Sequence, residues 1–221
     1  MHQAGPTLEG MSHLSLVALL AAAAWMPTSP VRVVLAFDPR LPAAISRLAA
    51  AEAAAVWKIY GVTVVGPDAM TACLPVDCLI TARLAVVIED HEDAGEQARL
   101  VPLGAIRFRD DGVPEKTILL RYRALTTLGL STVTVGDLHE PQWPPAMRHL
   151  VVGRIVGRVV AHEIGHWLLQ RREHSPSGLM RAIQPTADLA EPARVKFTLL
   201  PADINRLREV VARRRSEQPS D

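Results

Sequence analysis

The sequence predicts an α+β fold, in which a twisted mixed sheet of about five strands carries a long helix and a small C-terminal part. Two observations lead to this fold class. Short apolar runs that end at Gly, Pro or Asp recur up to Arg121, as strands do. Two helical patterns accompany them, an Ala-rich pattern near the start and a longer one in the second half of the chain.

The first elements form a strand, a helix and a strand. Val31–Phe37 is mostly apolar and is expected to be a buried strand that ends at Asp38. An Ala-rich helix follows over Leu41–Tyr60, with Gly61 as its stop, and Val62–Val65 is the second strand. This order favours a parallel strand pair with the helix packed on it.

Three further strands complete the predicted sheet. They are expected at Leu84–Ile88, Leu103–Phe108 and Thr117–Arg121, and the last two are separated by a turn sequence that predicts a hairpin. A short helix is expected over Ala124–Leu130. A final helix should start at Pro201, because proline is tolerated in a first helical turn.

The longest helical pattern runs from about Ala146 to Gln170. Its first half is apolar nearly all round, which predicts a buried central helix, and Gly153 and Gly157 are expected to allow close packing on the sheet. The helix should end near Gln170 or Arg172, since the residue before Pro176 avoids the α region.

Near its end this helix contains the pattern H-E-x-x-H, formed by His162, Glu163 and His166. One helical turn separates the two histidines, so both imidazoles point to one face and can bind one Zn²⁺. Glu163 lies about 100° round the helix, where its carboxylate can take a proton from a zinc-bound water. The spacing therefore predicts two metal ligands and a general base.

A catalytic zinc site needs a third protein ligand. His174 follows the expected end of the helix and could approach the metal as the chain turns back. Asp188 and Glu191 are rival ligands, because carboxylates also complete catalytic zinc sites.

The run from His162 to His166, then His174-Ser175 and Gly178-Leu179-Met180, resembles the metzincin zinc peptidases, and their matrixin-like branch most of all. The resemblance implies a zincin architecture in which His162, His166 and His174 bind zinc, Glu163 is the general base and Met180 lies in a turn beneath the metal. The spacing departs from the family pattern: His174 comes two residues later than the usual third ligand, whose place is taken by Arg172.

The predicted function is that of a zinc-dependent endopeptidase that hydrolyses peptide bonds through a Glu-activated, zinc-bound water. One alternative is a zinc-binding protein of the same architecture without general peptidase activity. Another is a zinc peptidase that uses Glu191 as its third ligand. The expected partner is a peptide or protein substrate of a monomeric enzyme.

The length and the net charge of the chain limit these expectations. The chain has 221 residues, which predicts a single catalytic domain over 31–221, and a formal net charge of +1, which gives no electrostatic case for nucleic-acid binding. The apolar run Leu14–Met26 is too short to span a bilayer but suits a signal peptide, so residues 1–30 are expected to be a leader and linker.

The expected compartment is secreted or periplasmic, with a cytoplasmic protein as the alternative. Cys73 and Cys78 are the only cysteines, and they could close a small disulfide loop in an oxidising compartment or remain unpaired.

Overall fold

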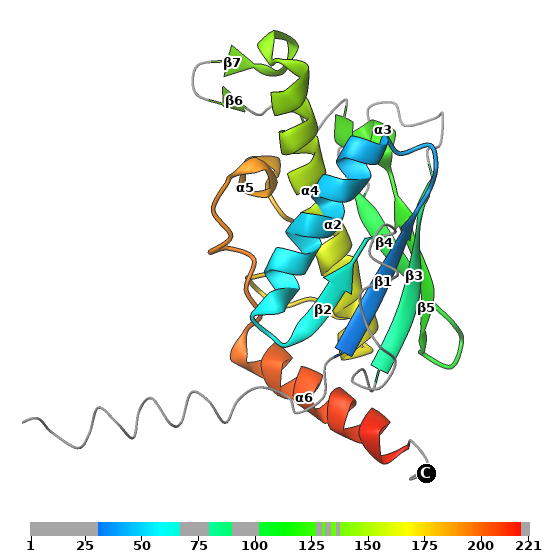
Figure 1. Cartoon of the computed structure of the whole chain (residues 1–221). Coiled ribbons are helices and arrows are strands. Elements are labelled where there is room, and N and C mark those ends of the chain that lie inside the picture. Colours follow the sequence, from blue (N-terminus) through cyan, green and yellow to red (C-terminus); the bar gives the residue numbers. More distant parts are fainter. Residues whose placement is uncertain are drawn as a thin grey trace, which may run out of the picture.

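The computed structural model of the chain describes residues 31–66, 80–89, 102–126, 130, 134–135 and 138–217. It confirms the α+β fold with a mixed five-stranded sheet, whose strand order is β2-β1-β3-β5-β4 (Figure 1). The strands are β1 (Val31–Phe37), β2 (Val62–Val65), β3 (Ile80–Ile88), β4 (Gly104–Phe108) and β5 (Pro114–Leu120). The first two have the predicted bounds, whereas β3 and β5 begin before the residues expected from the sequence.

The pairing of the strands confirms the predicted parallel pair of β1 and β2 and adds the partners of β3. β1 is parallel to both β2 and β3, and β3 is parallel to β5. β4 and β5 form the predicted antiparallel hairpin, with a register irregularity between Ile106 and Phe108. Consequently β4 lies at one edge of the sheet that the described residues form, with β5 as its strand partner there.

Two long helices, α2 (Ala43–Lys58) and α4 (Pro145–Leu169), lie side by side on one face of the sheet (Figure 1). Trp57 of α2 donates its indole N–H to the carbonyl oxygen of Ala161 in α4 at 3.0 Å. A Cβ atom on Gly153 would come within 2.4 Å of Leu48, and one on Gly157 within 2.7 Å of the Ala49 carbonyl oxygen. The prediction that these glycines pack on the sheet is therefore wrong, because they allow close packing of α4 on α2 instead.

The core lies between this helix pair and the sheet. Val33 and Leu35 of β1 are fully buried, and so are Val152, Ile155 and Val156 of α4. Truncating one of these large side chains, for example Ile155→Ala, costs about 2–5 kcal/mol because a cavity adds to the lost transfer free energy. The buried first half of α4 thus fixes the position of its second half, which carries the H-E-x-x-H pattern.

A buried arginine joins the C-terminal part to the two helices. Arg158 of α4 donates from Nε to Glu52 of α2 at 2.9 Å, and from its two Nη atoms to the carbonyl oxygens of Asp188 and Ala193 at 2.7 and 2.9 Å. Because buried charges need partners, this guanidinium holds the segment after residue 186 against α2 and α4.

The C-terminal part contains α5 (Thr186–Ala190) and α6 (Pro201–Ser216). α6 starts at the predicted proline. The structure also contains the small hairpin of β6 (Thr134–Val135) and β7 (Leu138–His139), the 3₁₀ turn Glu140–Gln142 and the helical turn α3 (Tyr122–Ala124). Neither α5 nor the small hairpin was predicted, and α3 begins before the expected Ala124.

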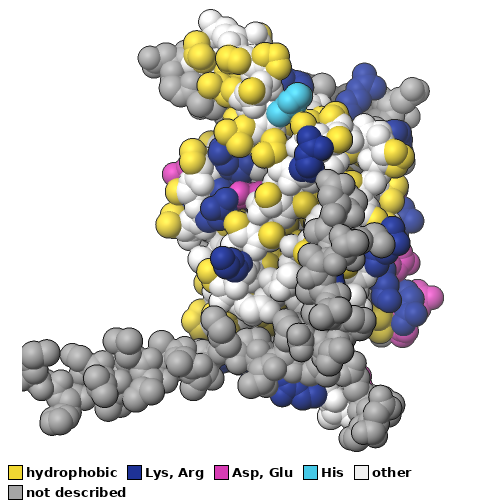
Figure 2. All heavy atoms as spheres, viewed as in Figure 1, with side chains coloured by type: hydrophobic (Ala, Val, Ile, Leu, Met, Phe, Trp, Pro, Cys, Tyr) yellow, Lys and Arg dark blue, Asp and Glu magenta, His cyan; other side chains and the backbone are white. Residues whose placement is uncertain are grey.

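Several predictions concern residues outside those that the structure describes. They are the leader at 1–30 and the redox state of Cys73 and Cys78, so export and the disulfide stay predictions. No helix in the described part of the chain is long and apolar enough to cross a bilayer. On the face shown in Figure 2, basic side chains are scattered among apolar ones rather than gathered in one patch, in line with the small net charge.

Candidate metal centre

The last two turns of α4 bring His162 and His166 together on one face of the helix. Their ring centroids lie 4.8 Å apart and their two Nε2 atoms 3.1 Å apart. His166 is buried and His162 half-buried. The helical period therefore places the pair as predicted from the sequence.

Each of these rings is fixed by a backbone carbonyl outside the helix. Nδ1 of His162 lies 2.7 Å from the carbonyl oxygen of Leu179, and Nδ1 of His166 lies 2.8 Å from that of Arg171. A carbonyl oxygen only accepts, so each Nδ1 carries the proton, and each Nε2 of the neutral ring presents a lone pair. Such contacts at the remote nitrogen are the usual way in which metal-binding histidines are oriented.

Two facing lone pairs cannot form a hydrogen bond with each other, but they can share a cation. A tetrahedral ion with bonds of about 2.0–2.1 Å has its ligand atoms about 3.3 Å apart. The 3.1 Å separation of the two Nε2 atoms is close to that value. The donor set therefore fits a metal ion better than a hydrogen-bonded histidine pair.

His174 joins the pair from the loop that follows α4. Gln170 ends the helix in the left-handed region, with φ 50°, so the chain reverses at once. The His174 ring stacks on His162 with centroids 5.3 Å apart and 19° between the planes. The candidate ligand atoms of His162, His166 and His174 all lie within 4.8 Å of one another, and this cluster could hold a metal ion.

The rival carboxylates have another partner. Lys196 donates to Asp188 at 2.8 Å and lies 3.3 Å from Glu191. Neither carboxylate belongs to the histidine cluster. The structure thus groups His174, and neither rival, with His162 and His166.

The loop that carries His174 is held by α6. Asp203 is 1% exposed, and its carboxylate accepts from the hydroxyl of Ser175 at 2.9 and 3.0 Å and from Arg171. Its second oxygen also accepts from the backbone N–H of Leu200 at 3.2 Å. The residue after His174 and the start of its loop are therefore fastened to one buried carboxylate.

A second loop passes beneath the two helical histidines. Met180 is fully buried, and a Cβ atom on Gly165 would lie 2.3 Å from its sulfur. Ser175 donates its backbone N–H to the Met180 carbonyl oxygen at 2.8 Å, which closes the loop. Gly178 adopts φ 76°, and a side chain there would meet the Thr198 carbonyl oxygen at 2.2 Å, so only glycine fits.

Glu163 lies on the neighbouring side of α4, against the edge strand. The side chain is 4% exposed, and a Cβ atom on Gly104 of β4 would lie 3.3 Å from its Oε1. Burial raises the pKa of Glu163 to about 8, and a hydrogen bond from the Ile106 backbone opposes the rise only in part. A divalent cation at the histidine cluster would favour the ionised carboxylate and so lower this pKa.

All three histidines are held in the neutral form that binds metals. Burial lowers the pKa of His162 to about 4, with a further contribution from His166. Burial also lowers the pKa values of His166 and His174, the latter with a contribution from the positive charge of Arg171.

The predicted site residues thus lie together. The sequence does not predict the groups that hold these residues in place. The sequence predicts the start of α6 at Pro201 but gives no sign that Asp203 holds the loop of His174, and the carbonyl groups of Arg171 and Leu179 leave no signal in a sequence. No protein-family model matches the chain, and no curated protein matches it either.

Proposed function

We propose that the protein is a zinc-dependent endopeptidase with a metzincin-like site, in which His162, His166 and His174 bind Zn²⁺ and Glu163 is the general base. One observation carries the proposal. The histidine cluster leaves two unprotonated Nε2 atoms 3.1 Å apart, with His174 beside them, next to a buried carboxylate on the same helix. Three imidazole ligands and an open fourth position are typical of catalytic zinc sites.

A bound zinc ion would supply a Lewis acid that polarises the scissile carbonyl and brings the pKa of a water towards about 7. The protein's own contribution comes from Glu163. Its carboxylate would accept the proton of the attacking water and return it to the leaving nitrogen. Burial of Glu163 supports this role, because it makes the carboxylate a stronger base than an exposed one.

The edge strand β4 supports a peptide as the substrate. β4 is an edge strand among the residues that the structure describes, and it passes Glu163 at Gly104. An extended peptide could add to such an edge through main-chain hydrogen bonds, which would place its carbonyl groups along the site. Proline substitutions within β4 that left the Michaelis constant unchanged would count against this placement.

The test is hydrolysis of a mixed quenched-fluorescent peptide library by the protein from Val31 onward, with zinc content measured alongside. We expect cleavage that a chelator abolishes and zinc restores. Glu163→Gln should retain one zinc ion per chain, and its cleavage rate should fall by a factor of about 10²–10⁴, the usual contribution of a general base.

Two outcomes would contradict the proposal. A Glu163→Gln variant that remained active would remove the carboxylate from the mechanism. Bound zinc without any cleavage would favour the alternative of a zinc-binding protein without general peptidase activity, for which the displaced His174 is the supporting observation.

A further inference from the structure

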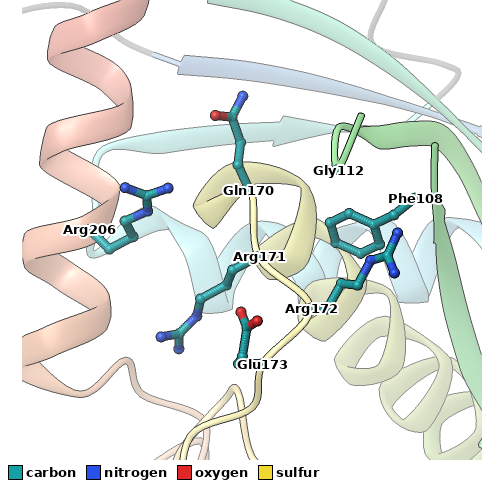
Figure 3. A pocket seen from close by; sticks show the side chains of 7 residues that line it. All are labelled: Phe108, Gly112, Gln170, Arg171, Arg172, Glu173 and Arg206. Atoms are coloured by element: carbon teal, nitrogen blue, oxygen red, sulfur yellow. The ribbon is translucent and has the colours of Figure 1, made fainter. Parts of the chain in front are cut away.

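A pocket of about 540 Å³ lies beside the histidine cluster, between α6, the end of α4 and the β4–β5 turn (Figure 3). Its lining is Phe108, Gly112, Gln170, Arg171, Arg172, Glu173 and Arg206. The rings of Phe108 and His166 form a T-shaped pair with centroids 6.4 Å apart, and the Arg171 carbonyl fixes His166. The pocket therefore shares residues with the surroundings of the metal site.

The pocket lining is rich in positive charge. It contains three guanidinium groups and one carboxylate, that of Glu173. Arg171 is paired with the buried Asp203, so its charge is already balanced. The nearby Arg109 and Asp111 of the β4–β5 turn pair with each other at 2.7 Å.

Arg172 and Arg206 are the two guanidinium groups available to a ligand. Arg206 donates to the Leu169 carbonyl oxygen at 3.1 Å, and its pair with Glu209 is long, at 3.5 Å, and exposed, which makes it weak. Within the described ranges no carboxylate pairs with Arg172, whose one hydrogen bond, to the Arg109 carbonyl oxygen, is 3.4 Å long. Its guanidinium lies 5.1 Å from the Phe108 ring centroid.

This cation–π contact keeps the Arg172 guanidinium beside Phe108, near the metal site. The planar fork of a guanidinium matches a carboxylate with two parallel hydrogen bonds. Figure 3 shows Arg206 reaching from α6 towards Gln170 and Arg171, while Arg172 lies over Phe108. A carboxylate in the pocket would meet the positive charges of Arg172 and Arg206 on two sides. Together these two charges outweigh the single negative charge of Glu173.

We propose that this pocket binds a carboxylate of the peptide substrate through Arg172 and Arg206, so that the site prefers peptides that present a carboxylate to the pocket. The inference rests on the proposed peptidase function. The carboxylate has two possible sources, a Glu or Asp side chain and the C-terminal carboxylate of the peptide. Both would present the same two oxygens to the guanidinium groups.

The test is binding of short coumarin-labelled peptides to the full-chain Glu163→Gln variant loaded with zinc, followed by fluorescence anisotropy. In one set of amidated peptides a single Glu is moved through every position, and a matched set has Gln in its place. A third set has Gln throughout and a free C-terminal carboxylate. We expect at least one carboxylate peptide to bind about tenfold tighter than its neutral match, as for a bidentate charged pair.

Arg172→Gln is the main variant, because Arg172 is exposed and its hydrogen bond to the Arg109 carbonyl oxygen is long, at 3.4 Å. It should bring the affinity ratio of acidic to neutral peptide close to one, and Arg206→Gln should lower it. Arg208→Gln is the matched control, with the same charge change two residues along α6, and should keep the ratio. Direct binding of the carboxylate to zinc would leave the ratio unchanged in all three variants, so its loss in Arg172→Gln is the result that assigns the carboxylate to the pocket.

Equal affinity for acidic and neutral peptides would overturn the proposal, and so would a preference that survives Arg172→Gln. The same peptides given to the wild-type protein separate this inference from the proposed function. Cleavage without a charge preference would contradict the role of the pocket and support the peptidase function. A charge preference in binding without any cleavage would contradict the peptidase function and support the role of the pocket.

Discussion

The candidate site is built from two unlike regions, a helix that carries two histidines and a loop that carries the third. His162 and His166 lie on the buried end of α4, and each Nδ1 is fixed by a carbonyl group at 2.7 or 2.8 Å. His174 is exposed, and its loop is held indirectly, through Ser175 and Asp203. We infer that the helical pair supplies a preorganised half of the site, while the geometry of the third ligand depends on α6.

The largest expected effect follows from this difference. His162→Ala should lower the zinc affinity by more than about a hundredfold, above the range seen when partners of metal ligands are removed. His174→Ala should cost about tenfold less, because the rigid pair on α4 survives. Competition with a chromophoric chelator at pH 7 measures both, with His149→Ala on the same helix as the control. An equal loss for the two variants would show that the loop is as preorganised as the helix.

Asp203→Asn should weaken the loop side alone. The substitution removes the charge that pairs with Arg171 and one of the two oxygens that face Ser175, so we expect a loss of about 10-fold in zinc affinity. In a His174→Ala background the loss should shrink, because the carboxylate acts through that loop. Asp188→Asn, which removes an exposed pair with Lys196, is the control. An undiminished loss in the double variant would assign Asp203 to general stability.

The same contrast explains how much could be predicted from the sequence. Helical spacing is local, so His162, Glu163 and His166 could be placed on one helix before any contact was known. His174 could be named as a ligand, but the reversal at Gln170 and the role of Asp203 depend on contacts between distant segments. These contacts leave no periodic signal in the chain.

The fold divides in the same way. β1 and β2 have their predicted bounds because an apolar run between turn residues is itself a local signal. The packing of Gly157 was predicted on the wrong partner, since a glycine shows that something comes close without showing what. Likewise, nothing in the sequence around Arg158 indicates that it holds three separate backbone carbonyl groups.

A third prediction compares how the contributions of Glu163 and the histidines to folding stability depend on pH, in protein that a chelator has freed of metal. The pKa of Glu163 is raised from 4.5 to about 8, so its contribution to stability is present at low pH and is lost as pH rises towards 8. The pKa of His162 is lowered from 6.5 to about 4, so stability is lost instead as pH falls from 6.5 towards 4.

The two groups can be separated above pH 6.5, where the histidines contribute little further change. Between about pH 6.5 and 8.5, Glu163→Gln should gain about 2 kcal/mol of unfolding free energy relative to wild type. Urea unfolding at both pH values measures this difference, and saturating zinc should diminish it by lowering the pKa of Glu163. A difference that does not change with pH would mean that Glu163 is ionised without the metal.

The smallest expected effect concerns Met180, which supports the helical pair without being part of the cluster. Its sulfur would lie 2.3 Å from a Cβ atom on Gly165, between the two histidines of α4, yet His162 donates its Nδ1–H to the neighbouring Leu179 carbonyl oxygen. Met180→Leu keeps the volume, so it should cost about 1 kcal/mol of stability and change the zinc affinity by less than about twofold. A large loss of zinc affinity with little loss of stability would show that packing beneath α4 sets the geometry of the helical pair. The helix alone would then not be enough to preorganise this half of the site.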